Sequence, residues 1–153
     1  TGAVGVVRRD PMAMRPFCGY NMADYWQHWL DMGEKLPNAP KIFNVNWFRT
    51  DDNGRFLWPG FGDNLRVLEW ILKRCFDEVG ADETVIGYEP KPEDINLDGS
   101  GVTVETLKAL LTLDAESWRE NCAGIREYFA QFGDKLPHEL REELEALEKA
   151  FAE

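Results

Sequence analysis

The chain has 153 residues, 44% of them hydrophobic, and a formal net charge of −11 at pH 7. A chain of this length can bury one core, so a single domain is the default expectation. The negative charge repels phosphate backbones and anionic lipid headgroups, which argues against nucleic acids and membranes as partners. The three cysteines are widely spaced and form no CxxC motif. Such thiols fit a reducing compartment, and we expect a cytoplasmic protein.

The start of the chain indicates a fragment. It begins at Thr1 without Met and continues as "TGAVGVV", which is too short for a signal peptide and lacks a basic leader. No apolar run approaches the ~20 residues that a membrane-spanning helix needs. We therefore expect a piece of a longer protein that is neither secreted nor membrane-spanning.

The first predicted element is a helix over residues 21–35. Asn21 is a residue type that caps helix N-termini, and Gly33 and Pro37 mark the far end. Apolar residues recur between these signals at helical spacing, namely Met22, Tyr25, Trp26, Trp29 and Leu30.

Two strands are predicted next, over residues 41–50 and 55–58. Alternating apolar residues in "KIFNVNWF" favour the first strand, and the Asn53-Gly54 pair is typical of a two-residue hairpin turn in which both residues have positive φ. Pro59-Gly60 ends the second strand. Strand alternation further predicts that Trp47 and Trp58 are core residues.

Helices dominate the rest of the chain. A second amphipathic helix is predicted after Asn64, with Leu65, Leu68, Ile71, Leu72 and Cys75 as its apolar face. The strand-like run "TVIGY" follows. Beyond residue 102 the spacing predicts three helices, which begin at Thr103, Asp114 and Pro137, with Gly133 as the stop of the middle one.

One motif matches a calcium-binding loop. "DINLDGSGVTVE", residues 94–105, satisfies the pattern D-x-[DN]-x-[DN]-G-x5-E. However, Pro90 and Pro92 stand where the entering helix of such a loop should be, and no second loop exists to pair with this one. We interpret the segment as an ordinary Asp/Asn/Gly turn that leads into a helix, with a calcium-binding module as an alternative.

The chain offers little catalytic machinery. It has two histidines, no HExxH motif, no His/Cys metal cluster and no glycine-rich phosphate loop. The notable stretch is "NWFRTDDNGRFLWPGFGDN", residues 46–64, in which aromatic residues alternate with turn residues. Phe48, Phe56 and Phe61 could converge on one outer site, and Asn64 offers an amide nearby. Ring stacking with directional hydrogen bonds is how a purine base is held, although a hydrophobic partner surface is equally compatible with these residues.

Three stretches resemble a known family. "DPMAMRPFCGYNMADYWQHWL", "PKIFNVNWFRTDDNGRFLWPGFGDNLRVLEWILKR" and "IGYEPKPEDINLDG" are similar to the C-terminal part of GTP-dependent phosphoenolpyruvate carboxykinase. The resemblance covers about residues 10–100 with distinctive motifs and the helical tail, 103–153, more loosely. Cys18 departs from the aromatic residue expected after "MRPF", and Arg15 is assigned no catalytic role.

The resemblance implies an α+β fold, in which this helix-rich piece of a two-lobed enzyme carries the nucleotide-base loop on a short β-hairpin at residues 41–64. It also implies that residues 1–10 are the trailing part of an active-site lid. The implied guanine-binding residues are Phe48, Phe56, Phe61, Gly62, Asp63 and Asn64.

In the family, oxaloacetate is decarboxylated and the enolate takes the γ-phosphoryl group of GTP, which gives phosphoenolpyruvate, GDP and carbon dioxide in gluconeogenesis. The resemblance places the catalytic residues and the ligands for manganese or magnesium upstream of this chain, in a parent enzyme that we expect to be monomeric. The chain alone is therefore expected to be inactive. The alternative is a free-standing acidic interaction module with an aromatic binding surface.

Overall fold

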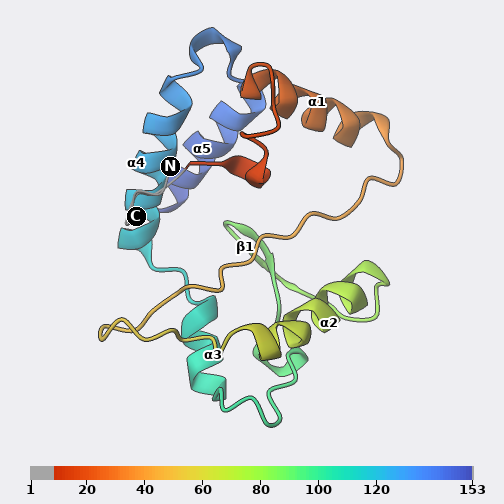
Figure 1. Cartoon of the computed structure of the whole chain (residues 1–153), viewed down its shortest axis with the longest axis vertical. Helices are drawn as coiled ribbons and strands as arrows, with labels where there is room; N and C mark the ends of the chain where they lie inside the picture. The colour runs from red at the N-terminus through yellow and green to blue at the C-terminus, as the bar shows by residue number, and fades with distance from the viewer. Residues whose placement is uncertain (1–8, 153) are drawn as a thin grey trace. The chain divides into compact units, whose positions relative to one another are not determined.

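The computed structural model describes residues 9–152, and these form two compact units (Figure 1). Unit 1 consists of residues 9–39 and 115–152, and unit 2 of residues 40–114. Each unit has a buried hydrophobic cluster of its own. Residues 1–8, which make up most of the predicted lid segment 1–10, lie outside the described residues.

Unit 1 is helical. Its helices are α1 (Met22–Lys35), α4 (Ala115–Ala130) and α5 (His138–Ala150), with short 3-10 turns at Pro11–Ala13 and Gly133–Lys135. The predicted cap of α1 is confirmed, because the Asn21 side chain accepts a hydrogen bond from the Ala23 N–H at 2.9 Å. The helices predicted from Asp114 and Pro137 are confirmed as α4 and α5, which pack against each other.

The core of unit 1 is organised around Trp26. This side chain is 6% exposed, and its ring meets those of Tyr128, Phe129 and Phe132 edge to face at centroid distances of 6.2, 5.7 and 4.8 Å. Edge-to-face contacts between aromatic rings add to the free energy gained from burial. Trp26 thus joins α1 to the end of α4, within a buried cluster that also contains Met22, Ala23 and Leu136.

Unit 2 combines two helices with a small sheet. The helices are α2 (Asn64–Cys75) and α3 (Val104–Leu111), and the strands β1 (Asp82–Thr84) and β2 (Gly87–Glu89) form an antiparallel hairpin. Short 3-10 turns occupy Phe61–Asp63 and Pro92–Asp94. The buried cluster consists of Trp70, Ile95 and Leu107. The chain as a whole is helix-rich with a two-stranded antiparallel hairpin, in keeping with the predicted α+β class.

The predicted strands at 41–50 and 55–58 are wrong. The only pairing there is a single bridge between Thr50 and Phe56, and the two-stranded sheet lies at 82–89 instead. The turn also differs, because Gly54 has φ 75° whereas Asn53 does not have positive φ. An isolated two-stranded hairpin is marginally stable. Two backbone hydrogen bonds join the segments here, from the Asp51 N–H to the Arg55 carbonyl and from the Leu57 N–H to the Arg49 carbonyl, each at 2.9 Å.

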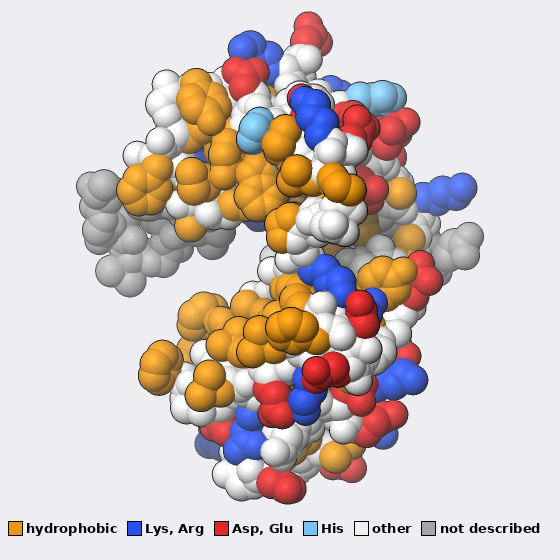
Figure 2. Space-filling view, turned by 90° about the vertical axis from the view of Figure 1, so that its right-hand side faces the viewer, with side chains coloured by type: hydrophobic (Ala, Val, Ile, Leu, Met, Phe, Trp, Pro, Cys, Tyr) orange, Lys and Arg blue, Asp and Glu red, His pale blue; other side chains and the backbone are white. Residues whose placement is uncertain are grey.

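The predicted apolar face of α2 is wrong except at Ile71, which packs against the buried cluster of unit 2. Leu65, Leu68 and Leu72 are 71%, 42% and 58% exposed, whereas Trp70, on the opposite side of the helix, is 4% exposed. The large indole buries more apolar surface than a leucine, so it determines which side of α2 faces the core of the unit. Figure 2 shows hydrophobic side chains gathered on a face of unit 2.

None of the helices in residues 9–152 is both long enough and apolar enough to cross a membrane.

Replacing Trp26 by alanine is expected to lower the free energy of unfolding by about 3–5 kcal/mol, because the change removes a buried aromatic side chain and leaves a cavity. Chemical denaturation would measure the loss. Trp29→Ala is the matched control. Trp29 lies on the same helix, is 40% exposed and has one edge contact with Tyr25, so its loss should be about 1 kcal/mol or less. Equal losses for the two variants would contradict this description of the core.

An ion pair between α4 and α5 predicts a pH dependence of stability. Arg126 donates from Nε to Glu148 Oε1 at 2.7 Å and from a second nitrogen to Oε2, and these bonds lower the pKa of Glu148. A carboxyl group with a lowered native pKa stabilises the fold above its unfolded pKa, and this stabilisation is lost as pH falls through the native pKa. Glu148→Gln should therefore lower the Tm at pH 7, and the difference from wild type should shrink below about pH 4. Glu143→Gln, an exposed site on the same helix, should show no such convergence. A Glu148→Gln effect of equal size at every pH would count against the ion pair.

Candidate functional site

The six predicted guanine-binding residues all lie in unit 2. Phe48 and Phe56 come together, with ring centroids 6.1 Å apart and an interplanar angle of 63°. They remain 72% and 64% exposed. Two exposed rings held edge to face offer a planar ligand one ring face and one ring edge.

The turn between these rings is well defined. Asp51 Oδ1 accepts hydrogen bonds from the N–H groups of Asn53 and Arg55, each at 2.9 Å. The Gly54 N–H donates to the Asp51 carbonyl, and Gly54 takes the left-handed conformation that glycine favours. The reversal at Asp51 therefore places Phe56 across from Thr50, beside Phe48.

Arg49 anchors the same segment to α3. Its Nη1 donates to the carbonyls of Leu110 and Ala109, at 2.6 and 3.2 Å. These carbonyls lie in the last turn of α3, where a cation is favoured by the helix dipole. Burial raises the pKa of nearby Glu89, and the positive charge of Arg49 partly offsets that rise.

Phe61 and Gly62 form an open part of the site. Phe61 is 95% exposed, and within the described residues its ring has no aromatic partner, so the structure does not bring it against Phe48 or Phe56. A Cβ placed on Gly62 would have no atom within 4 Å, so the backbone there is open to a ligand. Gly60, with φ 109° and ψ −152°, turns the chain into this segment in a conformation that only glycine adopts readily.

Asn64 is the first residue of α2, and its side chain is already oriented. Trp58 donates from Nε1 to Asn64 Oδ1 at 2.9 Å. Trp58 is 4% exposed and lies beside Trp47, with ring centroids 6.3 Å apart. The sequence predicts the burial of Trp58 but not its hydrogen bond, because nothing in a local pattern pairs an indole with an amide six residues away.

Asp63 is held by Arg66, a residue that the sequence analysis missed. Arg66 donates from Nε to Asp63 Oδ1 at 2.8 Å, and its two terminal nitrogens donate to the carbonyls of Asn96 and Asp98 at 2.7 Å each. The Arg66 and Asp63 side chains are 21% and 23% exposed. The arginine thus fixes the turn before Asn64 to a loop about 30 residues later.

The segment that matches the calcium pattern is the loop that receives Arg66. It forms the turn into a helix that the sequence predicts: the Asp98 N–H donates to Asn96 Oδ1, and the Thr103 hydroxyl accepts the Thr106 N–H at the start of α3. No group of three or more His, Cys, Asp or Glu side chains in residues 9–152 could hold a metal ion.

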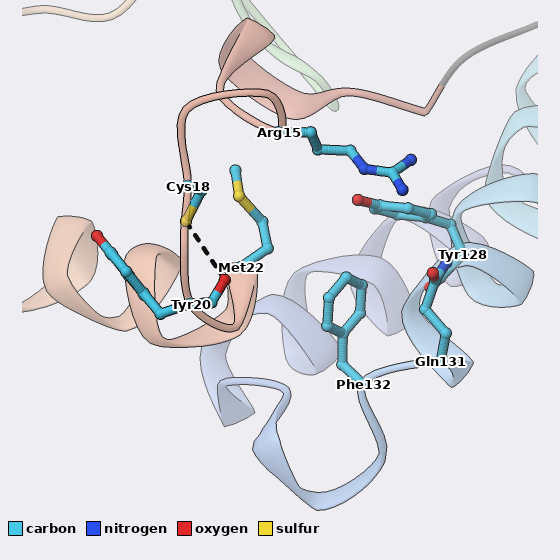
Figure 3. Close-up of a pocket in the computed structure, with 7 residues that line it drawn as sticks. All are labelled: Arg15, Cys18, Tyr20, Met22, Tyr128, Gln131 and Phe132. Carbon is cyan, nitrogen blue, oxygen red and sulfur yellow. Dashed lines mark hydrogen bonds between the residues drawn. The ribbon is translucent and has the colours of Figure 1, made fainter. Parts of the chain in front are cut away.

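A separate pocket of about 200 Å³ lies in unit 1 (Figure 3). Arg15 and Tyr128 approach each other at its upper side, and Cys18 Sγ donates to the Tyr20 carbonyl at 3.5 Å. The lining residues are Arg15, Cys18, Tyr20, Met22, Tyr128, Gln131 and Phe132. None of the predicted guanine-binding residues is among them.

Comparison with known proteins gives consistent results. Residues 1–150 match the family model described as the phosphoenolpyruvate carboxykinase C-terminal P-loop domain. The chain is 51% identical over 148 residues to phosphoenolpyruvate carboxykinase (GTP) of Treponema pallidum (strain Nichols), and this match covers 95% of the chain and 24% of the relative. The enzyme of the same name from Thermoplasma volcanium is also 51% identical, over 97% of the chain and 24% of the relative. The enzyme of that name from Chlamydia trachomatis serovar D is 48% identical, over 96% of the chain and 25% of the relative.

The chain therefore spans about a quarter of the length of the curated relatives that it matches. The family model, by contrast, accounts for nearly all of its residues. The chain belongs to the family of phosphoenolpyruvate carboxykinase C-terminal P-loop domains.

Proposed function

We propose that this chain is the guanine-binding part of a GTP-dependent phosphoenolpyruvate carboxykinase. The parent enzyme converts oxaloacetate and GTP to phosphoenolpyruvate, GDP and carbon dioxide in gluconeogenesis, in the cytoplasm. The observation that carries the proposal is the family match over residues 1–150. The exposed Phe48 and Phe56 pair and the oriented amide of Asn64 support it.

In this proposal the aromatic residues hold the base and Asn64 reads its edge. Stacking a base on an aromatic ring contributes about 1–3 kcal/mol and does not depend on which base is bound. Phe48, Phe56 and Phe61 therefore supply affinity. Selectivity comes from Asn64, aided by the open backbone of Gly62 and by Asp63, which Arg66 holds in place.

In this proposal the rest of the parent chain carries out the reaction. After decarboxylation, the enolate oxygen bonds to the γ-phosphorus of GTP, and the bond from that phosphorus to the bridging oxygen of GDP breaks. The proposal assigns manganese and magnesium to the upstream part, as the family resemblance implies. Residues 1–10 are proposed as the trailing part of the lid, and residues 41–64 as the guanine-binding segment. The parent enzyme is proposed to act as a monomer.

The first test uses the full-length product of the reading frame that encodes this chain. It should form phosphoenolpyruvate from oxaloacetate in the presence of manganese, with GTP strongly preferred over ATP. A full-length product without that activity would overturn the proposal.

In that enzyme, Phe61→Ala should raise the KM for GTP about tenfold or more, because it removes a stacking ring. The kcat should change little, since base stacking is equal in the ground state and the transition state. Asn64→Ala should reduce the preference for GTP over ATP. Steady-state kinetics with each nucleotide would measure both effects.

Phe76→Ala is the matched control. Phe76 is 71% exposed and lies at the other end of α2 from Phe61, so its loss should leave the KM for GTP unchanged. If Phe61→Ala and Phe76→Ala behave alike, the aromatic residues at 48–61 are not the base site.

A further inference from the structure

The hydrogen bond from Trp58 to Asn64 has a consequence for base selection. An asparagine side chain has an acceptor end, Oδ1, and a donor end, Nδ2 with two hydrogens. A freely rotating amide could present either end to a ligand. Trp58 has only a donor, its Nε1–H, and it is bonded to Oδ1 at 2.9 Å. The Nδ2 hydrogens have no partner among residues 9–152.

The neighbouring structure keeps this arrangement from relaxing. Trp58 is 4% exposed, so its indole has little freedom to turn away. The backbone of Asn64 is fixed as the first residue of α2, directly after Asp63, whose carboxylate is bonded to Arg66 at 2.8 Å. Both ends of the Trp58–Asn64 bond are therefore held by other contacts.

A purine with an acceptor at position 6 fits such a site. Guanine presents acceptors at O6 and N7, whereas adenine presents a donor, the 6-amino group, in place of O6. The Asn64 donors can pair with O6 but not with the amino group. A binding site with a fixed donor discriminates strongly, since the wrong ligand leaves buried polar groups unpaired.

We propose that Trp58 is a specificity-determining positioning residue, which turns the donor end of Asn64 toward the base and so selects 6-oxopurine over 6-aminopurine nucleotides. This inference rests on the proposed function, because it assumes that Asn64 faces the base. Trp58 acts through Asn64 and does not itself touch the nucleotide.

The test is the dissociation constants of GTP, ITP and ATP for the full-length enzyme, measured by isothermal titration calorimetry. ITP keeps the 6-oxo group and lacks the 2-amino group, so the wild type should favour both GTP and ITP over ATP. In Trp58→Phe the ring remains but the N–H is lost, and the amide of Asn64 can turn over. The ratio of Kd for ATP to Kd for GTP should fall about tenfold or more.

Trp47→Phe is the control, because it removes the indole of the neighbouring ring, whose N–H makes no hydrogen bond within the described residues. For Trp47→Phe, the ratio of Kd for ATP to Kd for GTP should match that of the wild type. Asn64→Asp is a second variant that keeps an acceptor for Trp58 and replaces the donor end by an oxygen. It should lose GTP and ITP binding more than ATP binding, and it tests the proposal even if Trp58→Phe does not fold.

The outcomes separate the two proposals. A wild-type enzyme without preference for GTP over ATP would overturn the proposed function, and this inference with it. A wild type that prefers GTP, together with a Trp58→Phe variant of unchanged ratio and normal folding, would overturn the role of Trp58 alone. An Asn64→Asp variant with unchanged selectivity would likewise overturn it.

Discussion

The candidate site depends on the hydrogen bonds that the guanidinium group of Arg66 donates. It donates to one carboxylate oxygen and two backbone carbonyls, and so joins the turn before α2 to the loop at 96–98. Hydrogen bonds that involve a charged donor are stronger than neutral ones, and the planar arginine makes three of them at fixed angles. Ile95, next to this loop, is buried with Trp70. Polar and apolar contacts therefore fix the same loop, and through it the position of Asn64.

Much of the helical structure could be predicted because its signals are local. Asn21 and Thr103 each cap the helix that follows them, with a side-chain oxygen accepting a backbone N–H two or three residues later. Such bonds involve neighbouring residues, so a short stretch of sequence contains all the information. The turn within residues 94–105 is predictable for the same reason. The sequence predicts that Phe48, Phe56 and Phe61 converge. The reversal at Asp51 brings Phe48 and Phe56 together, whereas Phe61 has no aromatic partner among the described residues.

The remaining features depend on residues that are distant in sequence or on competition between local bonds. The apolar spacing of α2 fits a face with Leu65 and Leu72, but the position of Trp70 decides which side is buried. The alternation at 41–50 suggests a strand, yet among the described residues this segment pairs with the 55–58 segment at a single bridge, Thr50 with Phe56. The bonds from Arg66 to the loop at 96–98 and from Trp58 to Asn64 join partners that no spacing rule connects. The segment "DINLDGSGVTVE" forms the predicted turn into a helix, and the guanidinium group of Arg66 donates to its carbonyls at Asn96 and Asp98.

The division of the chain also constrains the order in which it can fold during synthesis. Unit 2 is continuous, whereas unit 1 is assembled from segments on either side of it. Trp26 must wait for Tyr128, Phe129 and Phe132, about 100 residues later, before its ring contacts can form. On the ribosome, unit 2 can be complete while α1 still lacks its partners, because domains generally fold as units while the chain emerges. The apolar side of α1 then stays exposed until α4 has left the ribosome.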